Sequence, residues 1–205
     1  MEFVKFFQTG GPFMYPILIV FAIGLAIALE RFLFLSRTNT RTKKIWGELV
    51  PMLKANDFQR AVNLTESIKT PLALLLNYGF ARHSANKKRE LIESAMEEGM
   101  MEALPSLEER THYLATFANI ATLLGLLGTI VGLIQAFTAV AAADPAEKAD
   151  LLSASISVAM NTTAFGLLAA IPLLLFHSYL VTKTARLVDN LEMAAVKCLN
   201  LMDRD

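Results

Sequence analysis

Hydroxyl and amide side chains within two otherwise apolar stretches are the residues of this sequence best suited to contact an ion. One stretch carries Thr122 and Thr129, and the other carries Asn161, Thr162 and Thr163. Polar side chains inside a membrane need a hydrogen-bond partner or water, so three consecutive ones favour a hydrated cavity or polar interface. The structural alternative stays open, because a threonine hydroxyl can also bond to the carbonyl four residues earlier in its own helix.

Small residues recur at helical spacing in the same two stretches. Thr122, Gly125, Thr129, Gly132 and Ala136 are separated by three or four residues, which places them on one face of a helix. The second stretch repeats the pattern in Ser155, Ala159, Thr162, Gly166 and Ala169. In a membrane, small residues let two helix backbones approach closely. The predicted helix-packing residues are Gly125, Gly128, Gly132 and Gly166.

Charged side chains are missing from both stretches. No Asp, Glu, Lys or Arg occurs in residues 111–143 or 151–182, and His112 and His177 lie toward the ends of these runs. A proton carrier inside the membrane needs a titratable group, usually a carboxylate. If this chain helps to move an ion, a partner must therefore supply the charged group.

The distribution of charge also predicts the fold class. The 205 residues include 19 Lys and Arg and 19 Asp and Glu, yet residues 6–29 form a third charge-free run. Each run exceeds the roughly 20 residues that cross a bilayer core. A hydrophobic content of 54% without a basic excess disfavours disorder and nucleic-acid binding. No alternating strand pattern appears, so we expect an all-α integral membrane protein with three transmembrane helices.

Flanking charges predict the orientation of these spans. Arg37, Arg41, Lys43 and Lys44 follow the first span, and a positive cluster of this kind stays in the cytoplasm. They also disfavour the alternative that the first span is a cleaved signal peptide. The N-terminus is then outside and the C-terminus cytoplasmic. The predicted parts are an outer amphipathic segment 1–11, spans 12–35, 112–143 and 151–182, a cytoplasmic region 36–111, an outer loop 144–150 and a cytoplasmic C-terminal helix 183–205.

The cytoplasmic region is predicted to be a helical bundle. Asp57 precedes an apolar periodic run as a helix cap does, Pro71 begins a second helix, and a third follows Asn86. We expect this third helix to run unbroken into the second span, and the last two long spans to extend into the bundle. At the end of the first span, Glu30 and Arg31 are expected to pair with each other or to snorkel toward water.

Signatures of enzymes are absent from the sequence. It contains no phosphate-binding loop, no nucleophile elbow and no zinc-protease motif, and its three histidines are dispersed. The lone Cys198 excludes a disulfide framework within the chain. We therefore expect neither catalytic residues nor a metal or other cofactor.

Two segments resemble a known family. Gly125-Leu-Leu-Gly-Thr-Ile-Val-Gly132, followed by Thr163-Ala-Phe-Gly-Leu-Leu-Ala-Ala-Ile-Pro172, is similar to the paired signature of the MotA/TolQ/ExbB proton-channel family. The similarity is nearest to the three-span ExbB/TolQ branch, and it extends to Leu29-Glu30-Arg31 and to the cytoplasmic insert. It implies the pore subunit of an ion-driven motor in the bacterial inner membrane, with the outer segments in the periplasm.

The resemblance also implies partners and site residues. In such motors, five copies of the pore subunit surround a dimeric, single-span ExbD/TolR-like protein whose membrane Asp carries the ion, and a TonB/TolA-like protein spans the periplasm. Thr129 and Thr163 match the pore-facing threonines of the family. Thr122 stands where a Pro is frequent, and Val158 where a Glu is common.

The transported ion and the role of the chain have alternatives. Thr162 beside Thr163 resembles the extra hydroxyls of sodium-driven relatives. We expect H+ as the transported ion, with Na+ as the alternative. A second hypothesis, from a different functional class, is a non-conducting membrane scaffold whose small residues only pack helices.

Overall fold

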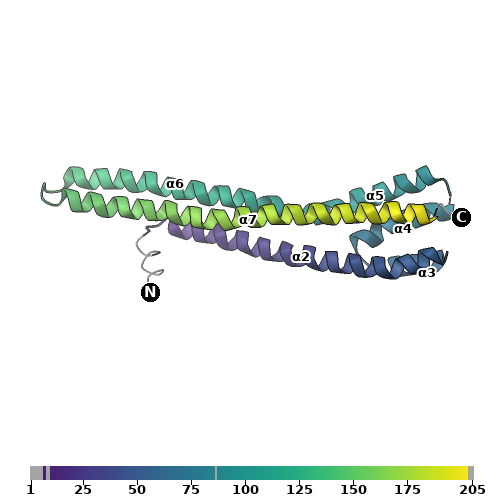
Figure 1. The fold of residues 1–205 in the computed structure, drawn as a ribbon. Coiled ribbons are helices and arrows are strands. Elements are labelled where there is room, and N and C mark those ends of the chain that lie inside the picture. The colour runs from purple at the N-terminus through teal and green to yellow at the C-terminus, as the bar shows by residue number, and fades with distance from the viewer. Residues whose placement is uncertain (1–6, 8–9, 86, 203–205) are drawn as a thin grey trace. The chain divides into compact units, whose positions relative to one another are not determined.

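The computed structural model describes residues 7, 10–85 and 87–202, and these residues form helices without any strand. The helices are drawn in order in Figure 1: α2 (Met14–Lys54), α3 (Phe58–Glu66), α4 (Pro71–Ala85), α5 (Arg89–Glu108), α6 (Thr111–Ala142) and α7 (Lys148–Met202). The all-α prediction is confirmed. Most of the predicted amphipathic segment 1–11 lies outside the described residues.

Three helical segments are long and apolar enough to cross a membrane. They are α2, the stretch Arg89–Ala142 that contains α6, and α7, with mean hydropathies of 2.4, 2.1 and 2.0 in their most apolar windows. This confirms the prediction of three transmembrane helices. The helix that contains the first span does not end at residue 35, because α2 continues to Lys54.

The expectation that the last cytoplasmic helix runs unbroken into the second span is wrong. Helix α5 ends at Glu108, Glu109 is extended with ψ 137°, and Arg110 has a left-handed backbone with φ 63°. Pro105 lies in the last turn of α5 and cannot donate a backbone hydrogen bond there. The chain turns at Glu109 and Arg110 before α6 begins.

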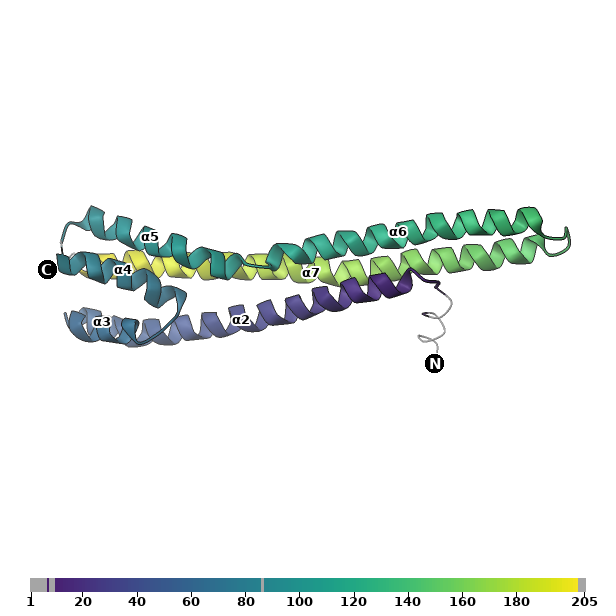
Figure 2. The same ribbon diagram turned by 180° about the vertical axis from the view of Figure 1, so that it is seen from behind.

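The chain divides into two compact units. The first, which we call the membrane unit, contains Met1–Glu30 and Arg110–Tyr179. Its core is the antiparallel pair of α6 and α7, which lie side by side in both ribbon views (Figure 2). The buried residues of this pair are mostly small, for example Ala118, Ala121 and Gly125 on α6 and Ala159 and Ala170 on α7.

The second part, the bundle unit, contains Arg31–Glu109 and Leu180–Asp205. Asp57 caps α3 by accepting a hydrogen bond from the backbone N–H of Arg60 at 3.3 Å, and α4 begins at Pro71, as predicted. Leu72, Leu75 and Leu76 of α4 are fully buried or nearly so. The predicted helical bundle is therefore present in this unit.

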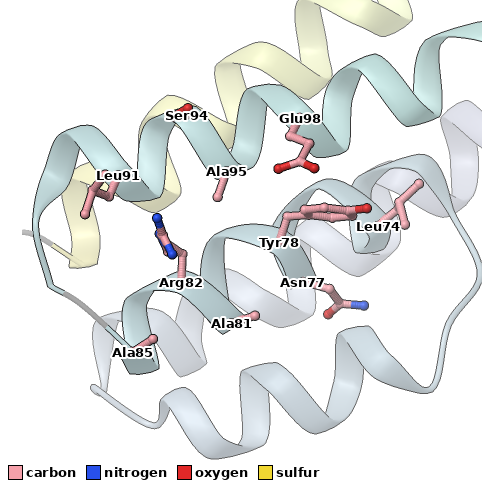
Figure 3. A pocket seen from close by; sticks show the side chains of 10 residues that line it. All are labelled: Leu74, Asn77, Tyr78, Ala81, Arg82, Ala85, Leu91, Ser94, Ala95 and Glu98. Atoms are coloured by element: carbon pink, nitrogen blue, oxygen red, sulfur yellow. The ribbon is translucent and has the colours of Figure 1, made fainter.

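An open cavity of about 580 Å³ lies between α4 and α5 in the bundle unit (Figure 3). Tyr78 of α4 donates a hydrogen bond of 2.5 Å to Glu102 of α5. That carboxylate raises the pKa of the Tyr78 phenol, because it bonds to the neutral form and repels the phenolate. Figure 3 shows Arg82 and Glu98 facing the same opening, so its lining carries both signs of charge.

Candidate ion pathway along the α6–α7 pair

The backbones of α6 and α7 touch at Gly125 and Gly166. A Cβ added at Gly125 would lie 3.2 Å from Cα of Thr163 and 3.3 Å from Cα of Gly166. One added at Gly166 would lie 2.7 Å from the carbonyl oxygen of Ala121. Gly166 has no room for a side chain, and at Gly125 a Cβ would require the facing backbone to shift by a few tenths of an ångström. Such close approach is how small residues associate helices in a membrane.

The other two glycines singled out by their spacing lie on the same line of contact. A Cβ added at Gly132 would lie 2.9 Å from Cβ of Ala159. One added at Gly128 would collide with the side chain of Thr162 and lie 3.2 Å from Cβ of Phe13. The structure thus brings all four glycines into one contact line, which we call the glycine seam: Gly125, Gly128, Gly132 and Gly166.

Thr163 joins the two helices by a hydrogen bond. Its hydroxyl donates to the carbonyl oxygen of Gly125 at 2.9 Å, and the side chain is half-buried. Gly125 lies about one helical turn before Thr129 on α6. The two threonines matched by the resemblance are therefore held close to the same stretch of α6.

Thr162, although adjacent in sequence, points elsewhere. Its side chain is 2% exposed, and its hydroxyl donates to the carbonyl oxygen of Gly10 at 2.6 Å, with that of Val158 as a second acceptor at 3.1 Å. This hydroxyl therefore links α7 to the segment just before α2 by a hydrogen bond. The hydroxyl proton is thus already used inside the subunit, and the side chain is buried.

Thr122 and Thr129 lie at the edge of the glycine seam. Their hydroxyls donate to carbonyls of their own helix, Thr122 to Ala118 at 3.1 Å and Thr129 to Leu126 at 2.6 Å. Thr122 is exposed and Thr129 is half-buried. Because each hydroxyl donates backward, its oxygen lone pairs remain available to a water or an ion.

Helix geometry places these threonines on one side of the pair. Each of the three follows a buried residue by one position: Thr122 follows Ala121, Thr129 follows Gly128, and Thr163 follows Thr162. Successive side chains of a helix are rotated by about 100°. In an antiparallel pair, the residues that directly follow the contact positions of the two helices therefore lie on the same side of the pair. We call this side the threonine flank and define it by Thr122, Thr129 and Thr163.

Helix α2 occupies the opposite side of the pair. A Cβ added at Gly24 would lie 2.8 Å from Leu173, and one added at Gly11 would lie 3.2 Å from Val158. The ring of Phe165 stacks edge-on against that of Phe7 at 5.7 Å. Val158 and Phe165 are turned about 140° and 160° from Thr163 around α7, so the threonine flank faces away from the chain that leads into α2. Val158, which replaces the common Glu, therefore does not lie on the flank.

Asn161 is not brought together with the threonines. It precedes Thr162, so the same rotation turns it away from the flank, and it is half-buried. Among the described residues, its amide has no hydrogen-bond partner. Of the five polar residues singled out in the two apolar stretches, three share a face, one is engaged in packing and one lies apart.

Arg31 and Glu30 have contacts that the sequence did not suggest. Arg31 is 3% exposed, and its Nη2 donates to the carbonyl oxygens of Ser106 at 3.1 Å and Leu107 at 2.5 Å. In the membrane unit, Glu30 pairs with Arg110 at 4.0 Å. The expected self-pairing is wrong, because Glu30 pairs with Arg110, and Arg31 does not snorkel, because it is buried against the end of α5.

Metal ligands do not gather in the described part of the chain. No three His, Cys, Asp or Glu side chains there lie close enough together to hold an ion. The chemistry of the site is accordingly that of hydroxyl and carbonyl oxygens. Such groups can bind water or a passing cation, but they do not supply a carboxylate.

Known proteins share this sequence pattern. The model of a family described as the MotA/TolQ/ExbB proton channel family matches residues 67–193, which include α6 and most of α7. A putative biopolymer transport protein ExbB homolog of Methanothermobacter thermautotrophicus is 27% identical over 192 residues, covering 93% of this chain and 67% of the relative. Biopolymer transport protein exbB1 of Vibrio cholerae is 30% identical over 172 residues, which cover 80% of this chain and 73% of the relative. The Tol-Pal system protein TolQ of Haemophilus influenzae is 37% identical over 86 residues, which cover 42% of this chain and 37% of the relative.

Proposed function

Because this chain belongs to the MotA/TolQ/ExbB proton channel family, we propose that it is the pore-forming subunit of a proton-driven motor in the bacterial inner membrane. Five copies would surround a dimeric, single-span ExbD/TolR-like partner, and a TonB/TolA-like protein would deliver the work across the periplasm. The observation that supports this most is the threonine flank, a row of hydroxyls in two helical stretches, 111–143 and 151–182, that contain no Asp, Glu, Lys or Arg. The partner would bring the missing carboxylate.

The position of α2 supports the same arrangement. It covers one side of the α6–α7 pair and exposes large apolar side chains such as Ile19 at 59% and Ile23 at 45%, which suit contact with lipid. In a ring of copies with α2 outermost, the threonine flank turns inward. Water held by Thr122 and Thr129 would then carry protons between the partner Asp and the two sides of the membrane.

Protons fit the geometry better than sodium does. A partly dehydrated Na+ needs several oxygen ligands, whereas a proton needs a single acceptor at a time. Thr162, the residue that suggested sodium, already donates to Gly10 at 2.6 Å, and Thr163 donates to Gly125 at 2.9 Å. Because Thr162 is 2% exposed, its oxygen is not open to the flank, which leaves the three hydroxyl oxygens of Thr122, Thr129 and Thr163 to enclose a metal ion.

The proposed orientation follows from the charges at the ends of the spans. The N-terminus lies in the periplasm and the C-terminus in the cytoplasm, because Arg37, Arg41, Lys43 and Lys44 follow the first span. The bundle unit is then cytoplasmic. No catalytic residue or bound cofactor is part of the proposal.

The test is proton uptake by the protein reconstituted in vesicles with its single-span partner, followed with an internal pH dye in sodium-free buffer. Thr129→Val and Thr163→Val should abolish uptake while the complex still assembles. Thr138→Val is the matched control, because Thr138 is an exposed threonine of α6 that also donates within its own helix. Full uptake in both flank variants would refute the role of the flank. A requirement for sodium would establish the alternative ion. Loss of assembly without any ion dependence would favour the scaffold hypothesis.

A further inference from the structure

A second open cleft in the bundle unit, of about 380 Å³, lies between α2 and the connection from α3 to α4. Two cations line it from α2 and a third from the connection, beside two isoleucines, one serine and one acid. These are Arg41, Lys44 and Lys69, with Ile45, Ile68, Ser67 and Glu48. We call this opening the basic cleft.

The three cations are not neutralised by the protein. Among the described residues, none of Arg41, Lys44 and Lys69 makes an ion pair or a side-chain hydrogen bond, and all three are exposed. Like charges around one opening repel each other, so an anion bound there would relieve this repulsion. Glu48 is the one acid in the lining and offsets only part of this charge.

The cleft lies close to the predicted membrane surface. Arg37, Arg41 and Lys44 are spaced four and three residues apart, so they form one cationic face of α2. Arg41 follows Leu35, the end of the predicted first span, by about 9 Å along the helix. The headgroup layer extends about 5–8 Å beyond the hydrocarbon core, and Arg and Lys side chains are long enough to reach back to it.

Orientation alone does not account for this arrangement. The rule that keeps positive charge in the cytoplasm depends on the number of Lys and Arg near a span, and it does not require them to converge. Here Lys69, which is distant in sequence, completes the same opening as Arg41 and Lys44. Basic pockets at the cytoplasmic side of membrane helices are suited to anionic headgroups.

We propose that the basic cleft binds the phosphate of an anionic phospholipid headgroup from the cytoplasmic leaflet. Arg41, Lys44 and Lys69 supply the charge and the hydrogen-bond donors, while Ile45 and Ile68 form part of the wall of the cleft. Ser67 takes no part as a donor, because its hydroxyl already donates to the carbonyl oxygen of Leu64 at 2.7 Å. Glu48 weakens the binding.

The experiment measures binding of phosphatidylglycerol to the full-length protein in phosphatidylcholine nanodiscs, by titrating in the anionic lipid and counting retained lipids by native mass spectrometry. The triple variant Arg41→Gln, Lys44→Gln, Lys69→Gln should bind on the order of a hundredfold more weakly, since each basic residue near an anionic surface contributes roughly fivefold. The matched control is Lys43→Gln, Lys54→Gln, Lys87→Gln, which removes the same charge from exposed positions outside the cleft. The control should keep most of the affinity.

Two further measurements separate the possible outcomes. Glu48→Gln should tighten phosphatidylglycerol binding about fivefold, a gain that a damaged fold would not produce. Inorganic phosphate at millimolar concentration should displace little of the lipid. Equal loss in the triple variant and the control would overturn the proposal, as would phosphate binding in detergent that the triple variant abolishes while leaving lipid binding intact. The second result would assign the cleft to a soluble phosphate.

Discussion

Arg31 on α2 donates a hydrogen bond of 2.5 Å to the carbonyl oxygen of Leu107 at the end of α5. The last carbonyls of a helix have no partner within it, and here a buried guanidinium provides one. The same guanidinium lies 4.7 Å from the ring centroid of Phe34. The turn at Glu109 and Arg110 is therefore stabilised by a side chain from a helix more than 70 residues away in sequence.

Replacing Arg31 by Met should destabilise the protein. The change leaves the carbonyls of Ser106 and Leu107 without their charged donor, a loss of about 2–3 kcal/mol for a buried bond of this kind. The measurement is the unfolding midpoint in detergent. Lys43→Gln, at an exposed position of the same helix, should stay within about 0.5 kcal/mol of the parent. Equal stability of both variants would exclude this role for Arg31.

Alanine substitutions along the helices should separate crowded glycines from open ones. Gly166→Ala places a Cβ 2.7 Å from a backbone oxygen, so it should cost about 1–3 kcal/mol and weaken the α6–α7 contact. Gly47 has nothing within 4 Å of its added Cβ, and Gly47→Ala in α2 should stabilise by about 0.5–1 kcal/mol. Chemical unfolding in detergent measures both. The two variants should change the free energy of unfolding in opposite directions. A stabilising Gly166→Ala would contradict the close approach at the seam.

Thr162→Val tests whether this threonine holds the chain or binds an ion. Loss of its hydroxyl leaves the carbonyl of Gly10 without its donor and should lower stability by about 1–2 kcal/mol. Proton uptake by the folded fraction should persist. Thr162→Ser, which keeps the hydroxyl, should recover most of the stability. Loss of uptake at unchanged stability would instead place Thr162 in the ion pathway.

Cys198 should resist alkylation while the protein is folded. Burial raises the pKa of its thiol to about 12, so almost no reactive thiolate exists at pH 8. Maleimide labelling at pH 8 should be slow in the folded protein and complete within minutes after denaturation. The shift also predicts that stability falls as the pH rises from about 9 toward 12, because the unfolded thiol then releases a proton that the folded one keeps. Cys198→Ala should lack this component of the pH dependence.

Local signals in the sequence were sufficient for most of the helices. The charge-free runs predicted three spans, Asp57 indicated a helix cap, and Pro71 indicated the start of α4, because each depends on neighbouring residues alone. The turn at Arg110 was not predictable in this way. Its left-handed backbone is accompanied by a bond from Arg31 to the preceding helix, a contact across the fold that local sequence does not encode.

The residues of the site were predictable from the sequence, but the direction in which each side chain points was not. Thr162 and Thr163 are adjacent hydroxyls, and helical spacing grouped Thr162 with the small residues of one face. The register of α7 against α6 then decides which hydroxyl is buried beside Gly10 and which bonds to Gly125. That register depends on Gly125 and Gly166 meeting at backbone distance, a relation between two helices.

The glycine seam has a mechanical consequence for this subunit. A shift of α6 along α7 by one residue would replace Gly125 opposite Gly166 with a larger side chain, and the gap between the two backbones admits none. The two helices therefore resist sliding past each other and form a stiff element with one register. In the assembly proposed above, this subunit would be the rigid part, and the partner that meets its threonine flank would be the part that moves.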